Sequence, residues 1–422
     1  MQLSDYLSEE WKPALGCTEP ASIALAASSA AAQSTGPVES VTLLCDPRIY
    51  KNCYAVGIPF SDHKVGIRWA LAIGSLLPDP SLELECFRNI DNDVLEAAAK
   101  LMESGEIHIE VDSGKEDLFI DCRVVRSKGQ GRAVIENEHT RLVHLEKDSR
   151  AISVKVENAT QAVPKLRAEL ADFQFEKLIE LAGSLTPKDR LQLRRGIELN
   201  MEIARHGLSL FPERFTQMGR QDPLSRISRR VCAGVYARMC GEDFSVMSLA
   251  GSGNKGIVCA VPLNMWAQEI GKSKEAIDQA LALACLVTSS TTHHLGTLSA
   301  VCGCSNAAGI GLAAGLTFLE GGGPDEISMS VNNMVGNVTG MICDGAKIGC
   351  ALKTMTSVDA AFRAASLALS GIGIPFSDGI VGRDGMESLA NLGKIATLGM
   401  AATDTEILKI MQAKLRSLKR NK

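Results

Sequence analysis

The chain has 422 residues, of which 45% are apolar and 22% are charged. This balance is typical of a folded globular protein and excludes a disordered or collagen-like chain. Acidic residues number 49 and basic residues 44, so the net charge of −5 offers no basic field to nucleic acid or to an anionic membrane. Aromatic residues make up 4%, which argues against a base-stacking surface or a sugar-binding platform.

The first residues, MQLSDYLSEEWKP, are acidic and lack the basic and then apolar pattern of a secretory signal. We therefore expect a cytoplasmic protein whose 13 cysteines are reduced thiols. One uncharged stretch, from Leu298 to Leu319, contains Gly311 and Gly315 at the spacing of close-packed membrane helices. Because the stretch also holds polar residues and lacks a flanking Lys/Arg bias, we interpret it as a buried helix or helix pair in a soluble core.

The chain before residue 250 has an ordinary mixed composition. EPASIALAASSAAAQSTG predicts an Ala-rich helix with Thr18 or Glu19 near its cap and Pro20 in its first turn. From about residue 40 to 150 the hydrophobic period shifts toward two, which predicts a half-exposed antiparallel meander. Residues 160–245 return to helical spacing and are rich in charge, as in a helical scaffold.

The rest of the chain is rich in small residues, with 23 of the 38 glycines between positions 251 and 399. Small residues let helix backbones approach closely, so we predict a compact bundle of buried helices with glycine-rich junctions. The expected fold class is α+β: an N-terminal helix and antiparallel-sheet domain, then a mostly all-α, Gly/Ala-rich catalytic domain. The expected boundaries are 1–39 (a helical segment that packs on the catalytic domain), 40–159 (the sheet domain), 160–245 (the helical scaffold) and 246–422 (the catalytic domain).

The segment GSGNKG at 251–256 matches the dinucleotide-binding fingerprint literally. The sequence after it, IVCAVPL, is β-branched and contains Pro262, so we expect no long helix there and disfavour a nicotinamide or flavin fold. We favour a nest of backbone N–H groups that holds a carboxylate or another small anion, and a tight turn with a solvated lysine is the alternative. The candidate binding residues are Gly251, Ser252, Gly253, Asn254 and Lys255.

Eight cysteines stand singly in apolar or strand-like surroundings, where a thiol acts as a small hydrophobic group: Cys45, Cys53, Cys86, Cys122, Cys232, Cys240, Cys259 and Cys285. Cys302 and Cys304 lie in AVCGCSNAAG, and Cys343 and Cys350 lie in MICDGAKIGC. On a regular helix, the seven-residue separation of Cys343 and Cys350 would place their backbones about 10 Å apart, which suits a larger inorganic cluster. Alternatively, the segment is a loop bent at its glycines. Soft thiolates in a charge-poor pocket favour iron–sulfur or Cu(I) chemistry, and the alternative is that these cysteines are thiols of the hydrophobic core. The sequence contains no CxxC pair, which argues against a zinc ribbon.

Cys17, in ALGCTEP, precedes a predicted helix start, where N–H dipoles favour a thiolate. Glu19 would oppose that shift or accept a proton, so both a catalytic or ligating thiol and a plain loop cysteine stay open. His293 and His294, in TSSTTHHLGTLS, are candidates for a proton acceptor in a polar pocket, or for satisfied histidines at a helix end. Asp344 and Lys347 lie between two of the cysteines; they either contact the substrate and its surroundings or form a solvated pair.

Together, ALGCTEP, AGSGNKGI, LSAVCGCSNAAG and NMVGNVTGMICDGAKIGCALK resemble the serine dehydratase-like, iron–sulfur L-cysteine desulfidase family. The likeness runs from near residue 10 to near residue 410. The C-terminal part is similar to the α (catalytic) portion of bacterial iron–sulfur L-serine dehydratases, and GCSNAAG is similar to the stretch that carries their first cluster cysteine.

The resemblance implies that Cys304, or alternatively Cys302, ligates a 4Fe–4S cluster together with Cys343 and Cys350. Cys17 would sit at the open iron, as a displaceable ligand or as a catalytic thiol. The candidates for the base are Cys17, then His293, His294 and Lys255, and Thr18 and Glu19 join the candidate substrate contacts. The family pattern leads us to expect basic residues where this chain has Thr292 and Thr297.

The implied reaction is β-elimination of L-cysteine to pyruvate, ammonia and sulfide. The first alternative is L-serine dehydration at the same site, and the second is a metal- or amino-acid-binding protein without activity. A zinc or redox sensor is a third. We expect a small amino-acid substrate, a homodimer, and no nucleic-acid or membrane partner.

Overall fold

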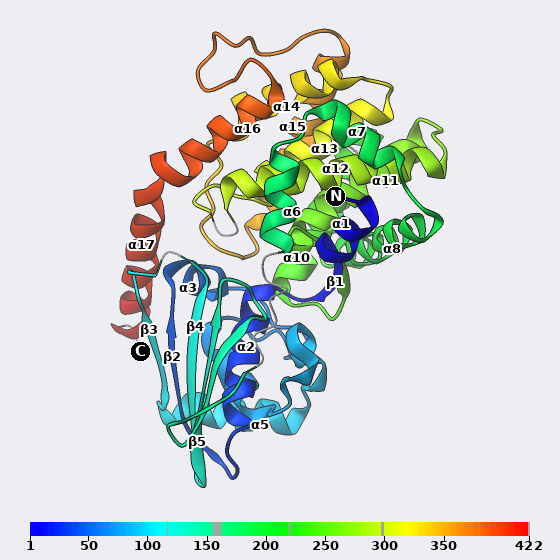
Figure 1. The fold of residues 1–422 in the computed structure, drawn as a ribbon. Coiled ribbons are helices and arrows are strands. Elements are labelled where there is room, and N and C mark those ends of the chain that lie inside the picture. The colour runs from blue at the N-terminus through cyan, green and yellow to red at the C-terminus, as the bar shows by residue number, and fades with distance from the viewer. Residues whose placement is uncertain (116, 155–161, 218, 220, 297–298, 421–422) are drawn as a thin grey trace.

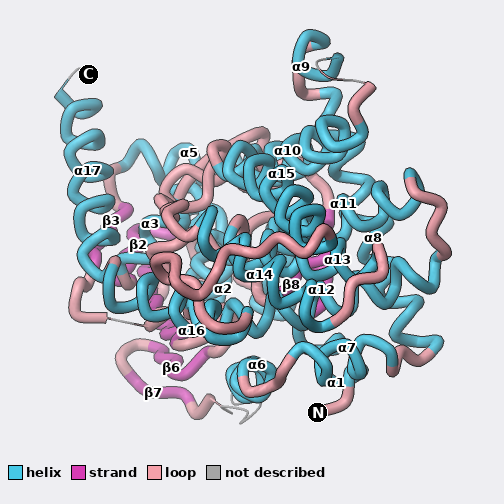
Figure 2. The backbone as a smooth tube through the Cα atoms, turned by 90° about the horizontal axis from the view of Figure 1, so that it is seen from above, coloured by secondary structure: helices cyan, strands magenta, loops and turns pink. Residues whose placement is uncertain are grey.

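The computed structural model describes residues 1–115, 117–154, 162–217, 219, 221–296 and 299–420. It has two parts, a sheet domain and a larger helical domain, which lie one below the other in Figure 1. The view from above in Figure 2 shows the dense packing of the helices around the helical domain's centre. The expected α+β class is confirmed.

The sheet domain is built on six strands in the order β3-β2-β4-β5-β6-β7. The strands are β2 (Val38–Cys45), β3 (Ile107–Val111), β4 (Phe119–Arg126), β5 (Gly129–Glu136), β6 (Leu142–Lys147) and β7 (Arg150–Ile152). The helices beside them are α2 (Thr18–Ala31), α3 (Pro47–Cys53), α4 (Ile67–Leu76), the 3₁₀ segment η1 (Pro80–Asn89) and α5 (Asn92–Ser104). The helix predicted after Cys17 is confirmed as α2, which packs so closely on β5 that a Cβ at Gly131 would lie 2.0 Å from the Ala30 carbonyl oxygen.

The antiparallel meander predicted for residues 40–150 is only partly correct. Strands β4 to β7 are antiparallel neighbours, but β3 pairs with β2 in parallel. A parallel pair needs a crossover connection, and helices α3 to α5 supply it. The sequence interpretation missed these helices, although Asp46 caps α3 through the N–H groups of Arg48 and Ile49, and Asp91 caps α5.

The helical domain begins with α1 (Leu3–Glu10) and a two-stranded antiparallel ribbon of β1 (Trp11–Leu15) and β8 (Ser245–Leu249). Its scaffold helices are α6 (Ala162–Ala171), α7 (Phe175–Gly183), α8 (Pro187–Ser209), α9 (Glu213–Gln217) and α10 (Pro223–Cys240). The remaining helices are α11 (Gly253–Glu269), α12 (Lys274–Leu295), α13 (Asn306–Leu319), α14 (Pro324–Val338), α15 (Cys350–Leu369), α16 (Gly385–Lys394), the π-helical segment η3 (Ile395–Gly399) and α17 (Ala401–Arg420).

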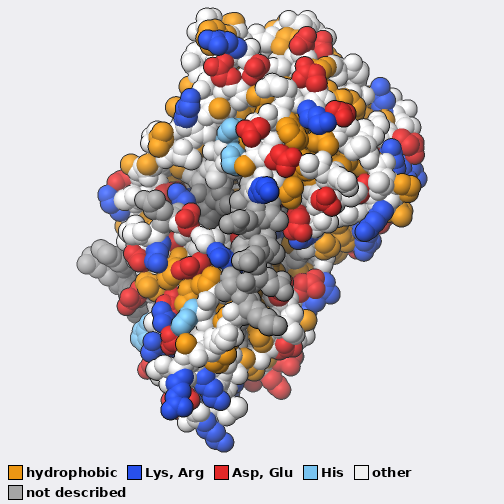
Figure 3. Space-filling view, in the orientation of Figure 1, with side chains coloured by type: hydrophobic (Ala, Val, Ile, Leu, Met, Phe, Trp, Pro, Cys, Tyr) orange, Lys and Arg blue, Asp and Glu red, His pale blue; other side chains and the backbone are white. Residues whose placement is uncertain are grey.

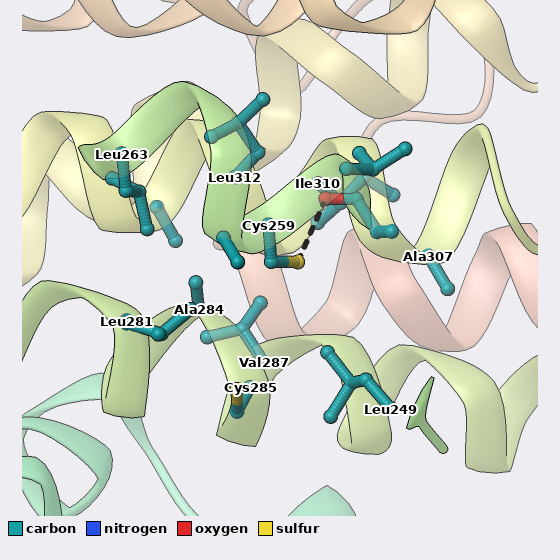
Figure 4. Close-up of a cluster of buried hydrophobic side chains, with 14 of the residues drawn as sticks. Leu249, Cys259, Leu263, Leu281, Ala284, Cys285, Val287, Ala307, Ile310 and Leu312 are labelled. Atoms are coloured by element: carbon teal, nitrogen blue, oxygen red, sulfur yellow. Dashed lines mark hydrogen bonds between the residues drawn. The ribbon is translucent and has the colours of Figure 1, made fainter. Parts of the chain in front are cut away.

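Small residues fill the contacts in the centre of this bundle. In Figure 4, Cys259 and Cys285 lie among Leu263, Val287 and Leu312, and both cysteines are fully buried. The Cys259 thiol donates a long hydrogen bond, 3.7 Å, to the Ala308 carbonyl oxygen. These two thiols fill core space as small hydrophobic groups, in agreement with the sequence interpretation.

The uncharged stretch near residue 310 forms α13, which lies buried against α12. A Cβ at Gly311 would lie 2.4 Å from the Ala284 carbonyl oxygen, so the glycine pair serves contact between two core helices. The interpretation as a buried helix is confirmed. No described helix combines the length and apolar character required to cross a bilayer, and on the face seen in Figure 3 acidic and basic side chains are interspersed.

The prediction that no long helix follows GSGNKG is wrong, because α11 continues through Pro262 to Glu269. Nearly every residue from Gly253 to Leu263 is buried in the core, and this packing outweighs the hydrogen bond that proline removes. The glycine motif still does not belong to a dinucleotide-binding fold, because β8 before it pairs antiparallel with β1 in a two-stranded ribbon rather than within a parallel sheet.

The two domains are joined at both ends of the chain. Segment 1–39 divides between two hydrophobic cores, since α1 and β1 pack in the helical core and α2 packs in the sheet core. At the other end, α17 leaves the helical domain and runs beside the sheet domain, as the red helix in Figure 1 shows. Leu408 of α17 belongs to the sheet core.

Candidate functional site

A cavity of about 90 Å³ lies where the two domains meet. Its lining residues from the N-terminal region are Glu19, Lys51, Asn52 and His139. Those from the helical domain are Ala250, Gly251, Ser252, Lys255, Thr292, Leu295, Gly296, Ser299, Val301, Gly303, Cys304 and Cys343. A space of this size holds a few water molecules or one small ligand.

Cys17 stands at the junction of β1 and α2. The chain turns at Gly16, with φ +68°, and Cys17 is then the N-cap residue of α2. The buried Cys17 thiol donates to Glu19 Oε2 at 3.3 Å. Burial, followed by the charge of Glu19, raises the pKa of Cys17 well above its ordinary value, which opposes the thiolate that the helix dipole alone would favour.

The Glu19 carboxylate accepts several hydrogen bonds. Thr18 Oγ1 and the Cys17 thiol donate to Oε2, and Asn52 Nδ2 donates to Oε1 at 3.1 Å. Burial alone would raise the pKa of Glu19, but the charge of His139, a backbone hydrogen bond, the Cys17 thiol and the more distant Arg238 together hold it below its ordinary value. The cavity therefore contains a half-buried carboxylate, held in its ionised form, that accepts a hydrogen bond from a thiol.

The glycine motif forms a turn followed by a helix start. Ala250 and Gly251 adopt positive φ values of +47° and +77°, and α11 begins at Gly253. The turn thus places backbone N–H groups of a helix N-terminus beside the cavity, as an anion site requires. A non-glycine residue in this conformation is strained, and Ala250 lies in the cavity wall.

Lys255 is buried, which excludes the alternative of a solvated lysine. Its Nζ donates to the Ala250 carbonyl oxygen and to Thr292 Oγ1, both at 3.0 Å. Burial lowers the pKa of Lys255 to about 8. Thr292, the residue that departs from the family pattern, is thus a hydrogen-bond partner of a lysine from another helix.

Arg238, on α10, connects the segment before Cys17 to the glycine motif. Its Nη2 donates to the Gly16 carbonyl oxygen at 2.6 Å, and its Nη1 donates to Asn254 Oδ1 at 3.0 Å. Arg238 is buried, and Asn254 is one of its anchors rather than a lining residue of the cavity. The positions of Cys17 and of the α11 N-terminus therefore depend on one guanidinium group.

The two cysteine-bearing loops are held against each other by backbone pairing. Val301 and Ile342 form an isolated antiparallel bridge. Cys302 N donates to the Met341 carbonyl oxygen, and Cys343 N donates to the Ala300 carbonyl oxygen at 2.7 Å. The chain from Cys343 to Gly349 is not helical and turns at Gly345, with φ +97°, before α15 begins. Of the two geometries considered for this segment, the structure has the bent loop.

Five thiols converge at this place. Cys304 and Cys343 line the cavity, and Cys302 and Cys350 are buried behind them. After burial, the largest effect of charge on the pKa of Cys350 comes from Cys302 and then Cys304, with Cys343 adding to it; all raise it, so the four sulfurs share one neighbourhood. Cys350 in turn raises the pKa of Cys17.

The spacing of these thiols bears on what they hold. Within the described ranges, no three side chains of His, Cys, Asp or Glu are arranged to hold one metal ion. In an iron–sulfur cluster each thiolate binds a different iron, so its ligands stand farther apart than those of one ion. The donor set, soft sulfurs with Ser252 Oγ 3.3 Å from Cys304 Sγ, fits a cluster better than a single hard cation.

The other predicted residues lie outside the cavity. His293 and His294 end α12, with their rings 5.5 Å apart, and neither lines the cavity. Lys347 forms an ion pair with Asp344, which also pairs with Lys353. Thr297 lies outside the described residues.

The lining residues that the sequence did not predict include Lys51, Asn52 and His139, whose side chains are the ones able to bind a charged ligand from the N-terminal region. The Asp46-Pro47 pair is a readable helix start, and a helix from there would have placed Lys51 and Asn52 in its second turn. His139 lies in the connection between β5 and β6, where no local pattern marks it.

A family model described as serine dehydratase alpha chain matches residues 133–409. The chain is 38% identical to a UPF0597 protein of Geobacter sulfurreducens, over 97% of this chain and 98% of that one. It is 35% identical to a UPF0597 protein of Caldanaerobacter subterraneus, over 98% of both chains, and 34% identical to one of Clostridium tetani, over 97% of both. The chain therefore belongs to the serine dehydratase alpha chain family, among its UPF0597 relatives.

Proposed function

We propose that the protein is an iron–sulfur-dependent lyase that carries out β-elimination on a small α-amino acid, with L-cysteine as the substrate. The observation that carries the proposal is a cavity lined by two thiols, with three more thiols close by, that also holds a half-buried carboxylate and a buried lysine. Membership of a serine dehydratase family supports a lyase, and the soft donor set supports an iron–sulfur cofactor.

In this proposal Cys343, Cys350 and one of Cys304 and Cys302 hold a 4Fe–4S cluster. Three protein ligands leave one iron open, and the bound cluster would supply a Lewis acid there for the substrate's leaving group. Cys304 is the favoured third ligand, because it lines the cavity whereas Cys302 is buried behind it.

The chain's own residues bind the substrate and move its proton. Lys255 and the N-terminus of α11 bind the substrate carboxylate. As a thiolate, Cys17 Sγ is the candidate base for the α-proton, and its hydrogen bond with Glu19 Oε2 holds the thiol in place before the proton is lost to solvent. As the Cα–H bond breaks, its electrons form the Cα–Cβ double bond and the Cβ–S bond breaks toward sulfide. The resulting enamine hydrolyses to pyruvate and ammonia.

L-serine is the second candidate substrate, and the description of the family favours it. The same residues serve both reactions, which differ in whether sulfide or water leaves. Hydrosulfide is a better leaving group than hydroxide and a softer ligand for iron, so we place L-cysteine first.

The test is to reconstitute the protein anaerobically and to measure pyruvate and sulfide released from L-cysteine and pyruvate released from L-serine. We expect a higher kcat/KM with L-cysteine, and loss of both reactions in Cys343→Ala. A higher kcat/KM with L-serine would reassign the substrate. Binding of an amino acid without release of pyruvate from either would contradict the lyase proposal.

A further inference from the structure

His139 enters the cavity from the sheet domain, far along the chain from the other groups. It lies in the connection between β5 and β6, and Ser22 Oγ donates to its backbone carbonyl oxygen at 2.6 Å. Ser22 is on α2, one turn after Glu19. The same helix therefore fixes both the carboxylate and the backbone that carries the imidazole.

The imidazole has an unused hydrogen-bonding atom. Its Nε2 is buried and has no partner among the described residues. A buried polar atom without a partner is costly and calls for an explanation, which a bound ligand supplies. Since His139 lines the cavity, a small molecule bound in the cavity could supply the missing hydrogen-bond partner.

The charges around His139 define what it can bind. Burial lowers the pKa of His139, while the facing Glu19 carboxylate raises it and Arg167 lowers it again. Burial favours the neutral form of the ring, in which one of its nitrogens is an acceptor. A neutral acceptor next to an ionised carboxylate suits a cation with several N–H donors.

The cavity residues of the helical domain include Lys255, and α11 begins beside them with its N-terminus. A zwitterion matches this arrangement, with its carboxylate toward Lys255 and its ammonium toward the sheet domain. We propose that His139 Nε2, together with Glu19 Oε1, binds the substrate's α-ammonium group, which makes His139 a substrate-binding residue that selects α-amino acids over α-hydroxy acids. This inference rests on the proposed function and specifies its substrate class.

The test compares the binding of L-alanine and L-lactate by titration calorimetry to the reconstituted protein. Neither ligand has a leaving group, and they differ in the ammonium group. We expect His139→Leu to raise the dissociation constant of L-alanine about tenfold or more, to leave that of L-lactate nearly unchanged, and to raise KM more than it lowers kcat. His139→Gln, which keeps a polar atom at similar reach, should recover part of the loss.

The matched control is His144→Gln on β6 of the same hairpin, because His144 pairs with Glu146 away from the cavity. It should leave both dissociation constants unchanged, and thermal unfolding followed by circular dichroism shows whether each variant folds. Equal loss of L-alanine and L-lactate binding in folded His139→Leu, or loss of neither, would overturn the assignment even if wild type releases pyruvate. His139-dependent binding of L-alanine without pyruvate release would uphold it and instead contradict the lyase proposal.

Discussion

The two walls of the cavity differ in chemistry. The wall from the N-terminal region carries two titratable groups, Glu19 and His139, together with Lys51 and the amide of Asn52. The wall from the helical domain carries two thiols, hydroxyl groups and backbone N–H groups, with Lys255 as the one charged lining residue among those described there. The lining thiols thus come from one part of the chain, and the lining carboxylate and imidazole come from another.

The same contrast appears in how each wall is held. The helical wall is fixed by packing of small residues and by backbone pairing between the two cysteine loops. The N-terminal wall is fixed by buried charges, among them Lys51 and Arg238. The two walls should therefore respond differently to substitution.

The largest effect is expected at Lys51, where the walls touch. Its Nζ donates to the Cys343 carbonyl oxygen at 2.9 Å and to Asp404 Oδ1 of α17 at 2.5 Å, and its side chain is 2% exposed. Lys51→Met removes the closer cation from a largely buried carboxylate, so we expect a loss of about 3 kcal/mol in the free energy of unfolding, measured with urea. Lys12→Met, which breaks an exposed pair with Glu9, should cost less than about 1 kcal/mol. Equal small losses would show that Lys51 does not hold the walls together.

A smaller loss is expected at Gly345, on the helical side of the same contact. Its φ is +97°, and a Cβ there would lie 2.2 Å from the Lys51 carbonyl oxygen. Gly345→Ala should cost about 2 kcal/mol in the same urea measurement, from backbone strain and overlap. Gly340→Ala is the control, because its Cβ would meet nothing within 4 Å. If the two variants have the same stability, the loop is not fitted to α3 as closely as described.

The smallest effect concerns Lys255, the charged group on the thiol wall. Its pKa is lowered to about 8, so it is a cation below that pH and loses its charge above it. If the cation binds the substrate carboxylate, KM rises as the pH rises through about 8. Thr292→Val removes an acceptor that favours the charged form, so this rise should move to lower pH.

Thr339→Val removes a hydroxyl that bonds only within α14 and should leave the pH profile of KM unchanged. Identical pH profiles of KM in wild type and Thr292→Val would show that Lys255 does not bind the substrate carboxylate.

The parts of the site that the sequence predicted are those marked by local patterns. Two such patterns are Cys17 before a helix start and the glycine turn beside Lys255. Each can be recognised from a few consecutive residues, because helix starts and turns are local structures. Tertiary contacts decided the rest. Packing carried α11 through Pro262, and pairing with β2 made β3 parallel.

His139 and Lys51 show the same limit at the site. Each acquires its role from segments distant in the chain: Lys51 from Asp404, 353 positions later, and His139 from Ser22, 117 positions earlier. No spacing rule connects such residues. His293 and His294 are the predicted proton acceptors of a polar pocket, yet both lie at the end of α12 and neither lines the cavity.

The most direct test of the central claim, that soft sulfur donors from the helical domain converge beside Cys17, is anaerobic quantification of iron and acid-labile sulfide. It compares wild type with single alanine variants of Cys17, Cys302, Cys304, Cys343 and Cys350, and with Cys259→Ala as a core-thiol control. We predict about four irons per chain in wild type and in the control. Cys343→Ala, Cys350→Ala and one of the variants at 302 and 304 should lose the cluster, and Cys17→Ala should retain it. Iron absent from wild type, or unchanged in all five variants, would contradict the account.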